Sequence, residues 1–186
     1  METPYRKRCK RYDIDGQAHC LTFSCFQRKP FLSKDRCCEW LIQGMQKGRE
    51  NGMYDLWGYV IMPEHVHIVL LPKPEVKISH ILSTIKQSAS KRALIWIKQN
   101  APDFLKRMED IQPDGKRHYR FWQRGGGYDR NLRRLEDVHE KIHYIHKNPV
   151  RRGLVKIPDD WKWSSFHAWQ TGDDIPIAID RESLVT

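Results

Sequence analysis

The chain has 186 residues, with 33 Lys or Arg against 23 Asp or Glu, which gives a formal net charge of +10. A chain of this length can bury a full hydrophobic core, and we expect one domain over residues 1–186, with a core at about 17–150 and a tail at 151–186. No apolar run approaches the roughly 20 residues of a membrane span, so a membrane protein is not expected. Residues 1–16 are basic with no apolar segment behind them, which does not fit a secretory signal and favours the cytoplasm.

The excess of basic residues suggests an anionic partner, most often nucleic acid. The basic residues are spread along the chain, in "YRKRCKR", "KQSASKR", "GKRHYRFWQR" and "NPVRRGL". This spread indicates a charged surface on the fold itself and not a single basic tail.

Five cysteines are present, and none of them forms a CxxC pair. An odd count argues against a complete disulfide framework, so we expect reduced thiols. The alternative is a zinc site that draws on Cys20, Cys25 and a histidine.

The first half of the chain reads as one strand, one helix and a hairpin. The stretch "HCLTFSCF" predicts a strand at His19–Phe26, and a helix follows from about Asp35 to Arg49. Strands are predicted at Tyr54–Met62 and His65–Pro72, joined by the tight Pro63-Glu64 connection, so the two should form an antiparallel hairpin.

The second half begins with a long amphipathic helix over Ile78–Asn100, for which Ser79 is the expected N-cap. Residues 102–120 should form a loop or a solvated hairpin, and "HYRFWQR", His118–Arg124, is the predicted fourth strand, ended by the run of three glycines that follows. The order is β-α-β-β-α-β, which predicts an α+β fold with a ferredoxin-like antiparallel sheet. One more helix and a Trp-rich tail, "DDWKWSSFHAW", follow, and the tail should pack back on the body.

Two histidines lie one residue apart on the predicted third strand. Successive side chains of a strand point to opposite faces, so His65 and His67 share a face while Val66 points the other way. Exposed strand histidines are common, and a metal site needs two or more ligands that converge and a position left open for substrate.

The helix in "LRRLEDVHEKIHYIHKN" carries a tyrosine away from its apolar stripe. Tyr144 and Asn148 are neighbours at i, i+4 spacing, on another side of the helix from the stripe. Pro149 should end the helix at Asn148, which leaves that amide free to turn toward a partner. The predicted stripe is Leu135, Val138, Ile142 and Ile145.

These residues suggest a chemistry. Two imidazoles with the amide oxygen of Asn148 as third ligand would suit Mn²⁺ or Mg²⁺ and leave room for water and a phosphate oxygen. Beside a metal-bound phosphodiester, the phenol of Tyr144 could attack in line and form a covalent phosphotyrosine.

The sequence resembles a known family at these residues. The stretch "PEHVHIVLLP" is similar to the His-hydrophobic-His motif, and "FWQRGGGYDRNL" with "YIHKNPVRRGLV" resembles the signature of REP-associated tyrosine transposases, within the insertion-sequence-type single-tyrosine transposases. The resemblance runs from about His19 to Trp169. It implies a ferredoxin-like fold, a divalent metal on His65 and His67, and Tyr144 as nucleophile. The wider group often has a glutamine four residues after the tyrosine as third ligand, where this chain has Asn148, as in the REP-associated branch.

The resemblance also implies a substrate, single-stranded DNA folded into a hairpin from short palindromic repeats, which the enzyme cleaves and rejoins. Phosphate contacts give such a strand salt-dependent affinity, and aromatic rings stack on its unpaired bases. Our candidates for phosphate contacts are Lys86, Arg124, Arg151 and Arg152, whereas Trp122 should belong to the core.

Several alternatives stay open. Related insertion-sequence enzymes are dimers with shared active sites and REP-associated members can be monomeric, so the chain is expected to be a monomer or a homodimer. A hairpin-binding protein that has lost catalysis would not need Tyr144, and a metal-dependent phosphate-ester hydrolase would tolerate Tyr144→Phe. The Gly125–Gly127 run departs from the glycine followed by aromatic residues that is more usual in the family, which puts base stacking by that loop in doubt.

Overall fold

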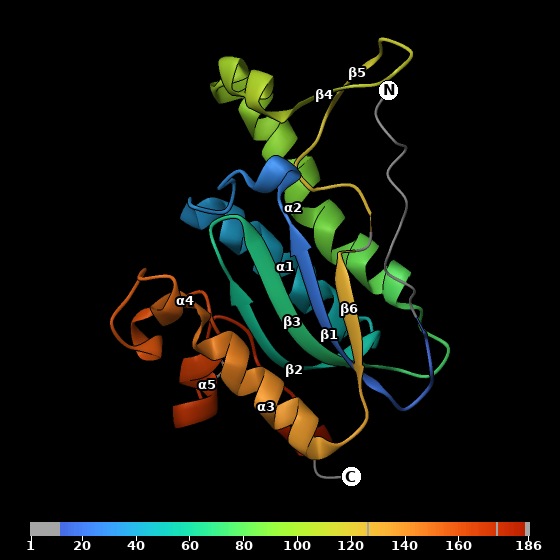
Figure 1. Cartoon of the computed structure of the whole chain (residues 1–186), viewed down its shortest axis with the longest axis vertical. Coiled ribbons are helices and arrows are strands. Elements are labelled where there is room, and N and C mark those ends of the chain that lie inside the picture. Colours follow the sequence, from blue (N-terminus) through green and yellow to red (C-terminus); the bar gives the residue numbers. More distant parts are fainter. Residues whose placement is uncertain (1–11, 126, 174, 185–186) are drawn as a thin grey trace.

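The computed structural model describes residues 12–125, 127–173 and 175–184 (Figure 1). The Cys9 thiol and the basic cluster at 5–11 lie outside these residues. The strands are β1 (Ala18–Ser24), β2 (Tyr54–Ile61), β3 (His65–Pro72), β4 (Glu109–Ile111), β5 (Arg117–Tyr119) and β6 (Tyr128–Leu132). The α-helices are α1 (Asp35–Glu50), α2 (Ile78–Asn100), α3 (Leu135–His146), α4 (Asn148–Arg151) and α5 (Phe166–Thr171), and the 3₁₀ helices are η1 (Phe26–Arg28), η2 (Pro102–Met108), η3 (Pro158–Asp160) and η4 (Arg181–Leu184).

The main sheet has four strands in the order β2-β3-β1-β6, and every neighbouring pair is antiparallel. With α1 between β1 and β2, and α2 between β3 and β6, this is the ferredoxin-like arrangement that the sequence predicts. The β2–β3 hairpin turns at Pro63-Glu64, where the amide of Met62 donates to the carbonyl of His65 at 2.8 Å. The predicted fold is therefore confirmed.

Side chains of β3 alternate between two apolar layers. Val66, Ile68 and Leu70 belong to the core under α1 and α2, whereas Val69 belongs to the core under α3. Because residues i and i+2 share a face, His65 and His67 point to the same side of the sheet as Val69. The histidine pair thus lies on the face that α3 covers, opposite α1 and α2 (Figure 1).

Helix α2 has the bounds that the sequence predicts and buries the expected apolar stripe, which includes Ile81, Ile85 and Ala89. The predicted N-cap is wrong, because Ser79 lies inside the helix. The carboxylate of Asp13 instead accepts a hydrogen bond from the amide of Ile78 at 3.3 Å, so an acidic group from the preceding chain satisfies that end. Among the described residues, no helix is both long and apolar enough to cross a membrane.

The predicted fourth strand at His118–Arg124 is wrong. The fourth strand of the sheet is β6, which lies after the glycine run and pairs with β1. Residues 117–119 form only a small hairpin with β4, and Trp122 makes a single bridge to Cys25. β6 is an edge strand of sequence YDRNL with alternate residues exposed, so it lacks the apolar pattern of an inner strand. Trp122 itself is buried against Phe23, with ring centroids 5.1 Å apart, so its assignment to the core is confirmed.

The Trp-rich tail packs along the free edge of β2. The amide of Ile61 donates to the carbonyl of Trp163 at 2.8 Å, and the indole N–H groups of Trp161 and Trp169 donate to the carbonyls of Ile61 and Trp57. These bonds satisfy backbone groups that an open sheet edge would leave exposed. The prediction that the tail packs back on the body is confirmed.

The four described cysteines are free. Cys20 lies in the core under α3 and Cys25 in the core under α1 and α2, on opposite faces of the sheet. The alternative of a zinc site that joins these two thiols is therefore wrong. Burial raises the pKa of Cys20 to about 11, so its thiol stays protonated.

Candidate active site

The two histidines at the start of β3 point their ring edges at one place. Their Nε2 atoms are 3.0 Å apart, and the rings are nearly perpendicular, with an interplanar angle of 88°. His65 is 7% exposed, so the pair is held within the protein surface. The face shared by the two side chains, predicted from the spacing, is what allows this convergence.

Both Nδ1 atoms have partners of their own. The carboxylate of Glu64 lies 3.0 Å from Nδ1 of His65, and the hydroxyl of Thr22 lies 2.7 Å from Nδ1 of His67. A neutral imidazole with Nδ1–H bound to a carboxylate has a bare Nε2, which is the tautomer that a metal needs. Thr22 can donate to or accept from His67, so this second ring can take either tautomer.

Glu64 and Thr22 were missed as site residues by the sequence analysis. Glu64 directly precedes the histidine pair, so the sequence itself shows an acidic side chain next to His65. Thr22 lies opposite His67 in the register of β1 and β3, which depends on long-range pairing that one sequence does not display.

Burial keeps the pair neutral. Burial, together with the nearby charges of His65 and Arg28, lowers the pKa of His67 to about 3. Burial also lowers the pKa of His65, against the opposing effect of Glu64. Burial alone would raise the pKa of Glu64, but His65 and Arg152 outweigh it and hold that pKa below its usual value. Near neutral pH the site therefore presents two neutral imidazoles beside an ionised carboxylate.

This donor set fits a divalent cation. Two ligands at roughly 2.1 Å from an octahedral ion and at a right angle to each other would lie about 3.0 Å apart, which is the separation of the two Nε2 atoms. In the described parts of the chain, no third His, Cys, Asp or Glu completes a metal-binding group with them. A third protein ligand from these parts of the chain would be another oxygen donor, such as a backbone carbonyl or the side-chain amide of Asn148.

Helix α3 places Tyr144 on the histidine side of the sheet. Val138, Ile142 and Ile145 are buried and join the core that contains Val60 and Val69 of the sheet. Tyr144 lies away from this stripe and is 43% exposed, as its helical position predicts. Leu135, the first residue of α3, is 46% exposed, so its predicted place in the stripe is wrong.

Two cations lie beside the tyrosine ring. The ammonium of Lys141 is 5.5 Å from the ring centroid of Tyr144, and the guanidinium of Arg151 is 5.0 Å from it. Such cations interact with the ring face and leave the phenol oxygen at the rim. They also put positive charge where a phosphate would approach the phenol.

Asn148 is only 8% exposed and begins the short helix α4, so the prediction of a free amide at a frayed end is wrong. The helix α3 ends earlier, at His146, and the chain continues into α4. One turn after Asn148, Arg152 donates to the carboxylate of Glu64 at 2.9 Å. This ion pair fastens the α4 segment to the residue next to His65, so Asn148 lies on a segment anchored at the histidine turn.

The chain is similar to known proteins over the segment that carries the two histidines. Residues 15–125 match the family model described as "Transposase IS200 like". The chain belongs to this family of DNA-cleaving transposases. The matched range, more than half of the chain, contains both histidines and ends before α3.

Individual relatives of the chain are transposases as well. The REP-associated tyrosine transposase of Escherichia coli K12 is 26% identical over 162 residues, which cover 85% of this chain and 81% of that protein. A Haemophilus influenzae protein assigned provisionally to the same group is 26% identical over 119 residues, and the chain spans 62% of its length. A REP-associated tyrosine transposase solved with a REP hairpin superposes with a TM-score of 0.67 at 22% identity, over 94% of this chain and 93% of that one, which supports the fold. The resemblance to REP-associated tyrosine transposases seen in the sequence is confirmed.

The four predicted phosphate contacts do not lie together. Arg151 and Arg152 are near Tyr144 and Glu64, as described above. Lys86 lies on the other side of the sheet, with its ammonium 5.5 Å from the ring centroid of Phe23. Arg124 pairs with Asp110 of the β4–β5 hairpin at 3.0 Å. Only Arg151 and Arg152 therefore belong to the surroundings of the candidate active site.

One cation near the histidines was missed. Arg28 is exposed, and its charge contributes to the lowered pKa of both His65 and His67. It sits in η1 directly after β1, where Gln27 and Arg28 both have left-handed backbone with φ of 52° and 54°. Non-glycine residues pay roughly 1–2 kcal/mol for this conformation, and such strain is often found at functional sites. The sequence offered no signal for it, because Arg28 lies outside every motif.

Proposed function

We propose that this chain is a metal-dependent single-stranded DNA endonuclease and strand transferase that acts on hairpin-forming repeat DNA. In this proposal, Tyr144 is the nucleophile, and His65, His67 and Asn148 hold Mg²⁺ or Mn²⁺. The observation that carries it is the convergence of two neutral imidazoles on the face of the sheet covered by the helix of Tyr144. Membership of the transposase family supports the reaction class.

The phenol oxygen of Tyr144 attacks the phosphorus of one phosphodiester. The new Tyr–O–P bond forms as one P–O bond of the DNA breaks, the phenol loses its proton, and the displaced sugar oxygen gains one. The bond energy of the ester is kept in the phosphotyrosine, so a free sugar hydroxyl can later reverse the step and rejoin strands.

A divalent ion, when bound, would polarise the scissile phosphate and offset the negative charge that develops on it. The residues of this chain prepare its place: Glu64 fixes the tautomer of His65, Thr22 supports His67, and Arg152 holds Glu64. Removal of such supporting partners typically costs 10- to 100-fold in metal affinity.

The DNA partner is proposed from the relatives and from charge. One solved relative binds a REP hairpin, and this chain carries a net charge of +10. Arg151 and Arg152, with Arg28, could bind the phosphates next to the cleaved bond, while Lys86 and Arg124 would contact more distant parts of the strand.

Metal removal tests this function. Purified protein would be stripped with EDTA and incubated with single-stranded hairpin oligonucleotides from the repeats that flank its gene, before and after addition of Mn²⁺ or Mg²⁺. We expect cleavage only with added metal, and loss of both cleavage and Mn²⁺ binding by calorimetry in His65→Ala. The matched control is His80→Ala, an exposed histidine on α2. Undiminished cleavage in EDTA, or Mn²⁺ binding that survives His65→Ala, would contradict the proposal.

A further inference from the structure

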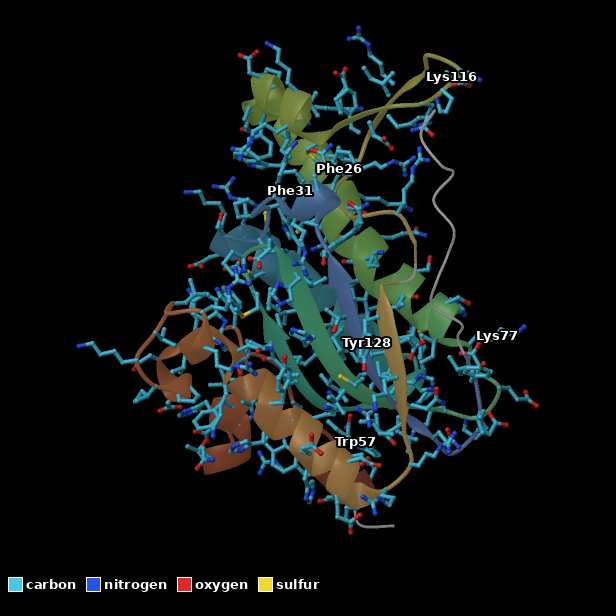
Figure 2. The ribbon with its side chains drawn as sticks, in the orientation of Figure 1. Phe26, Phe31, Trp57, Lys77, Lys116 and Tyr128 are labelled. Carbon is cyan, nitrogen blue, oxygen red and sulfur yellow. The ribbon has the colours of Figure 1, made fainter. Side chains whose placement is uncertain are left out.

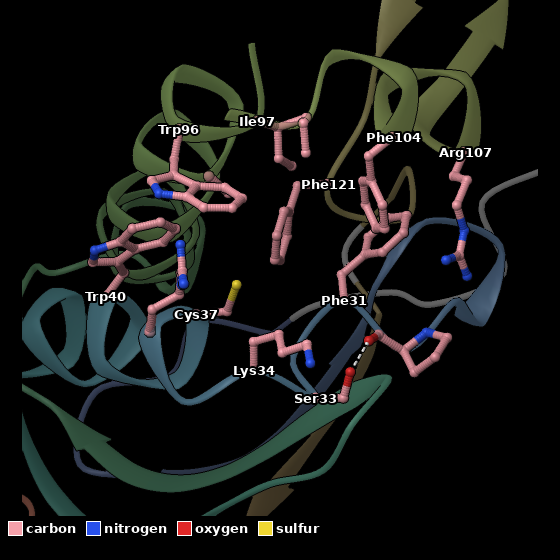
Figure 3. A pocket seen from close by; sticks show the side chains of 14 residues that line it. Phe31, Ser33, Lys34, Cys37, Trp40, Trp96, Ile97, Phe104, Arg107 and Phe121 are labelled. Carbon is pink, nitrogen blue, oxygen red and sulfur yellow. Dashed lines mark hydrogen bonds between the residues drawn. The ribbon is translucent and has the colours of Figure 1, made fainter. Parts of the chain in front are cut away.

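A second candidate site lies on the opposite side of the sheet from the histidines. It is a cavity of about 380 Å³ between the start of α1, the end of α2 and η2 (Figure 3). Its size falls within the range of roughly 300–1,000 Å³ that is usual for ligand pockets. The proposed mechanism uses none of the residues that line it.

Five aromatic rings line it. Figure 3 shows Trp40 and Trp96 on one side, Phe31 and Phe104 on the other, and Phe121 between them. The centroid of Phe31 is 5.6 Å from that of Phe104 and 5.5 Å from that of Phe121, in tilted and edge-on contacts. Such rings offer flat faces on which another planar ring can stack.

The rim is cationic. Lys34, Arg36 and Arg107 are exposed and line the cavity, and the guanidinium of Arg36 stacks on Trp96 at 4.0 Å from the ring centroid. Among the described residues that line this cavity, none is acidic. Aromatic walls with a positive rim suit a planar ring attached to an anionic backbone, which is the chemistry of a nucleotide in a single strand.

The loop after β1 joins this cavity to the histidine site. Its residues Phe31 and Ser33 line the cavity, while the amide of Leu32 donates to the carbonyl of Pro63 at 2.9 Å. Pro63 belongs to the β2–β3 turn, which is followed directly by His65. The exposed Arg28, whose charge lowers the pKa of both histidines, lies in the same loop. The ammonium of the next residue, Lys29, donates a hydrogen bond to the carbonyl of Arg107 on the rim of the cavity. A basic path thus runs from the histidines to the cavity.

We propose that this cavity binds an unpaired nucleobase of the DNA strand whose phosphodiester is held at the histidines. The base would stack on the aromatic walls, and the rim cations would bind the adjoining phosphates. This inference rests on the proposed function, because it takes the same single-stranded DNA as its ligand. It assigns to the chain a recognition site for the unpaired part of the substrate, separate from the hairpin stem.

An abasic scan tests the site. Hairpin oligonucleotides with single-stranded flanks would be made with one base at a time removed, and their Kd values measured for wild type, Phe104→Ala, Trp96→Ala and the control Leu105→Ala. Leu105 lies in the same 3₁₀ helix and does not line the cavity. We expect removal of one particular flank base to weaken wild type and Leu105→Ala roughly tenfold or more, and to have little effect in the cavity variants.

A second readout does not depend on any variant. A 5-iododeoxyuridine at the sensitive position should cross-link wild type under near-ultraviolet light to a peptide that contains Phe31, Trp96 or Phe104. An equal loss of affinity in all four proteins, or a cross-link that maps elsewhere, would overturn the nucleobase site while leaving hairpin binding intact. Absence of any hairpin binding by wild type would overturn the proposed function itself, and this inference with it.

Discussion

At the scale of single residues, the two histidines combine with neighbours of very different origin. Their shared face follows from strand geometry alone and could be predicted from the sequence. The hydroxyl of Thr22 reaches His67 only because β1 pairs with β3 in a register that places the two opposite each other. Arg152 reaches Glu64 from 88 residues away. Such supporting contacts depend on tertiary packing, and no local pattern in one sequence encodes them.

The buried His67 should make the protein sensitive to acid. Its folded pKa of about 3 lies below its ordinary value of 6.5, so between these values the unfolded chain binds a proton that the folded chain does not. We expect the free energy of unfolding to fall as pH drops from about 6.5 toward 3, and His67→Asn to flatten that slope in urea titrations. The exposed control His80→Asn should keep the full slope. His146, whose pKa burial lowers to about 4, should account for part of what remains in His67→Asn. An identical slope in wild type and His67→Asn would show that His67 is not buried as described.

At the scale of elements, the sequence was most informative where apolar periodicity was strong. The bounds of β3 and α2 are as predicted, and those of α1 and β2 differ by one residue. The failure concerns β6, whose stretch YDRNL is polar and whose buried contact is a polar one, between Nδ1 of His19 and the carboxylate of Asp129 at 2.7 Å. The apolar pattern predicts a strand at the aromatic residues before the glycines. Two of these residues, Phe121 and Trp122, instead pack against Phe31 and Phe23 of the core.

Gly127, directly before β6, lies against the strand that carries Thr22 of the active site. Its backbone is left-handed, with φ of 70°, and an added Cβ would lie 2.0 Å from the carbonyl oxygen of Thr22. We expect Gly127→Ala to lower the free energy of unfolding by at least about 2 kcal/mol, and to weaken Mn²⁺ binding, because Thr22 supports His67. Gly115→Ala is the matched control, since Gly115 also has positive φ, 78°, but nothing within 4 Å of its added Cβ. It should cost about 1 kcal/mol and leave Mn²⁺ binding unchanged. Equal losses in the two variants would rule out the predicted clash with β1.

At the scale of the whole molecule, the sheet separates two kinds of surface. One face carries the histidines and the helix of Tyr144, and the other carries the two long helices and the aromatic cavity (Figures 1 and 3). Figure 2 shows side chains with nitrogen at their tips on most sides of the molecule, in keeping with basic residues spread along the chain. The hydrogen bond of Leu32 with Pro63 joins the cavity loop to the histidine turn, and we expect a bound strand to follow the surface there.

We expect the active site to lie within one monomer. Helix α3 packs on the sheet of its own chain, and the pair of Arg152 with Glu64 holds the segment after it at the histidine turn. A mixture of Tyr144→Phe with His65→Ala should therefore form no covalent DNA adduct, as neither variant has both groups. An adduct that appears only in the mixture would show a dimer in which the tyrosine of one chain serves the histidines of the other.

The covalent adduct itself is the most direct measurement. Wild type, Tyr144→Phe and His65→Ala would be incubated with labelled hairpin oligonucleotides and Mn²⁺, then denatured and separated by size, with Tyr119→Phe, an exposed tyrosine of β5, as control. The account requires label that migrates with denatured wild type and with Tyr119→Phe, and none with the other two variants. If the DNA is cleaved with no adduct, and Tyr144→Phe still cleaves it, the result would contradict the account and favour a hydrolase. If the hairpin is bound but not cleaved, the result would contradict the account and favour a DNA-binding protein without catalysis.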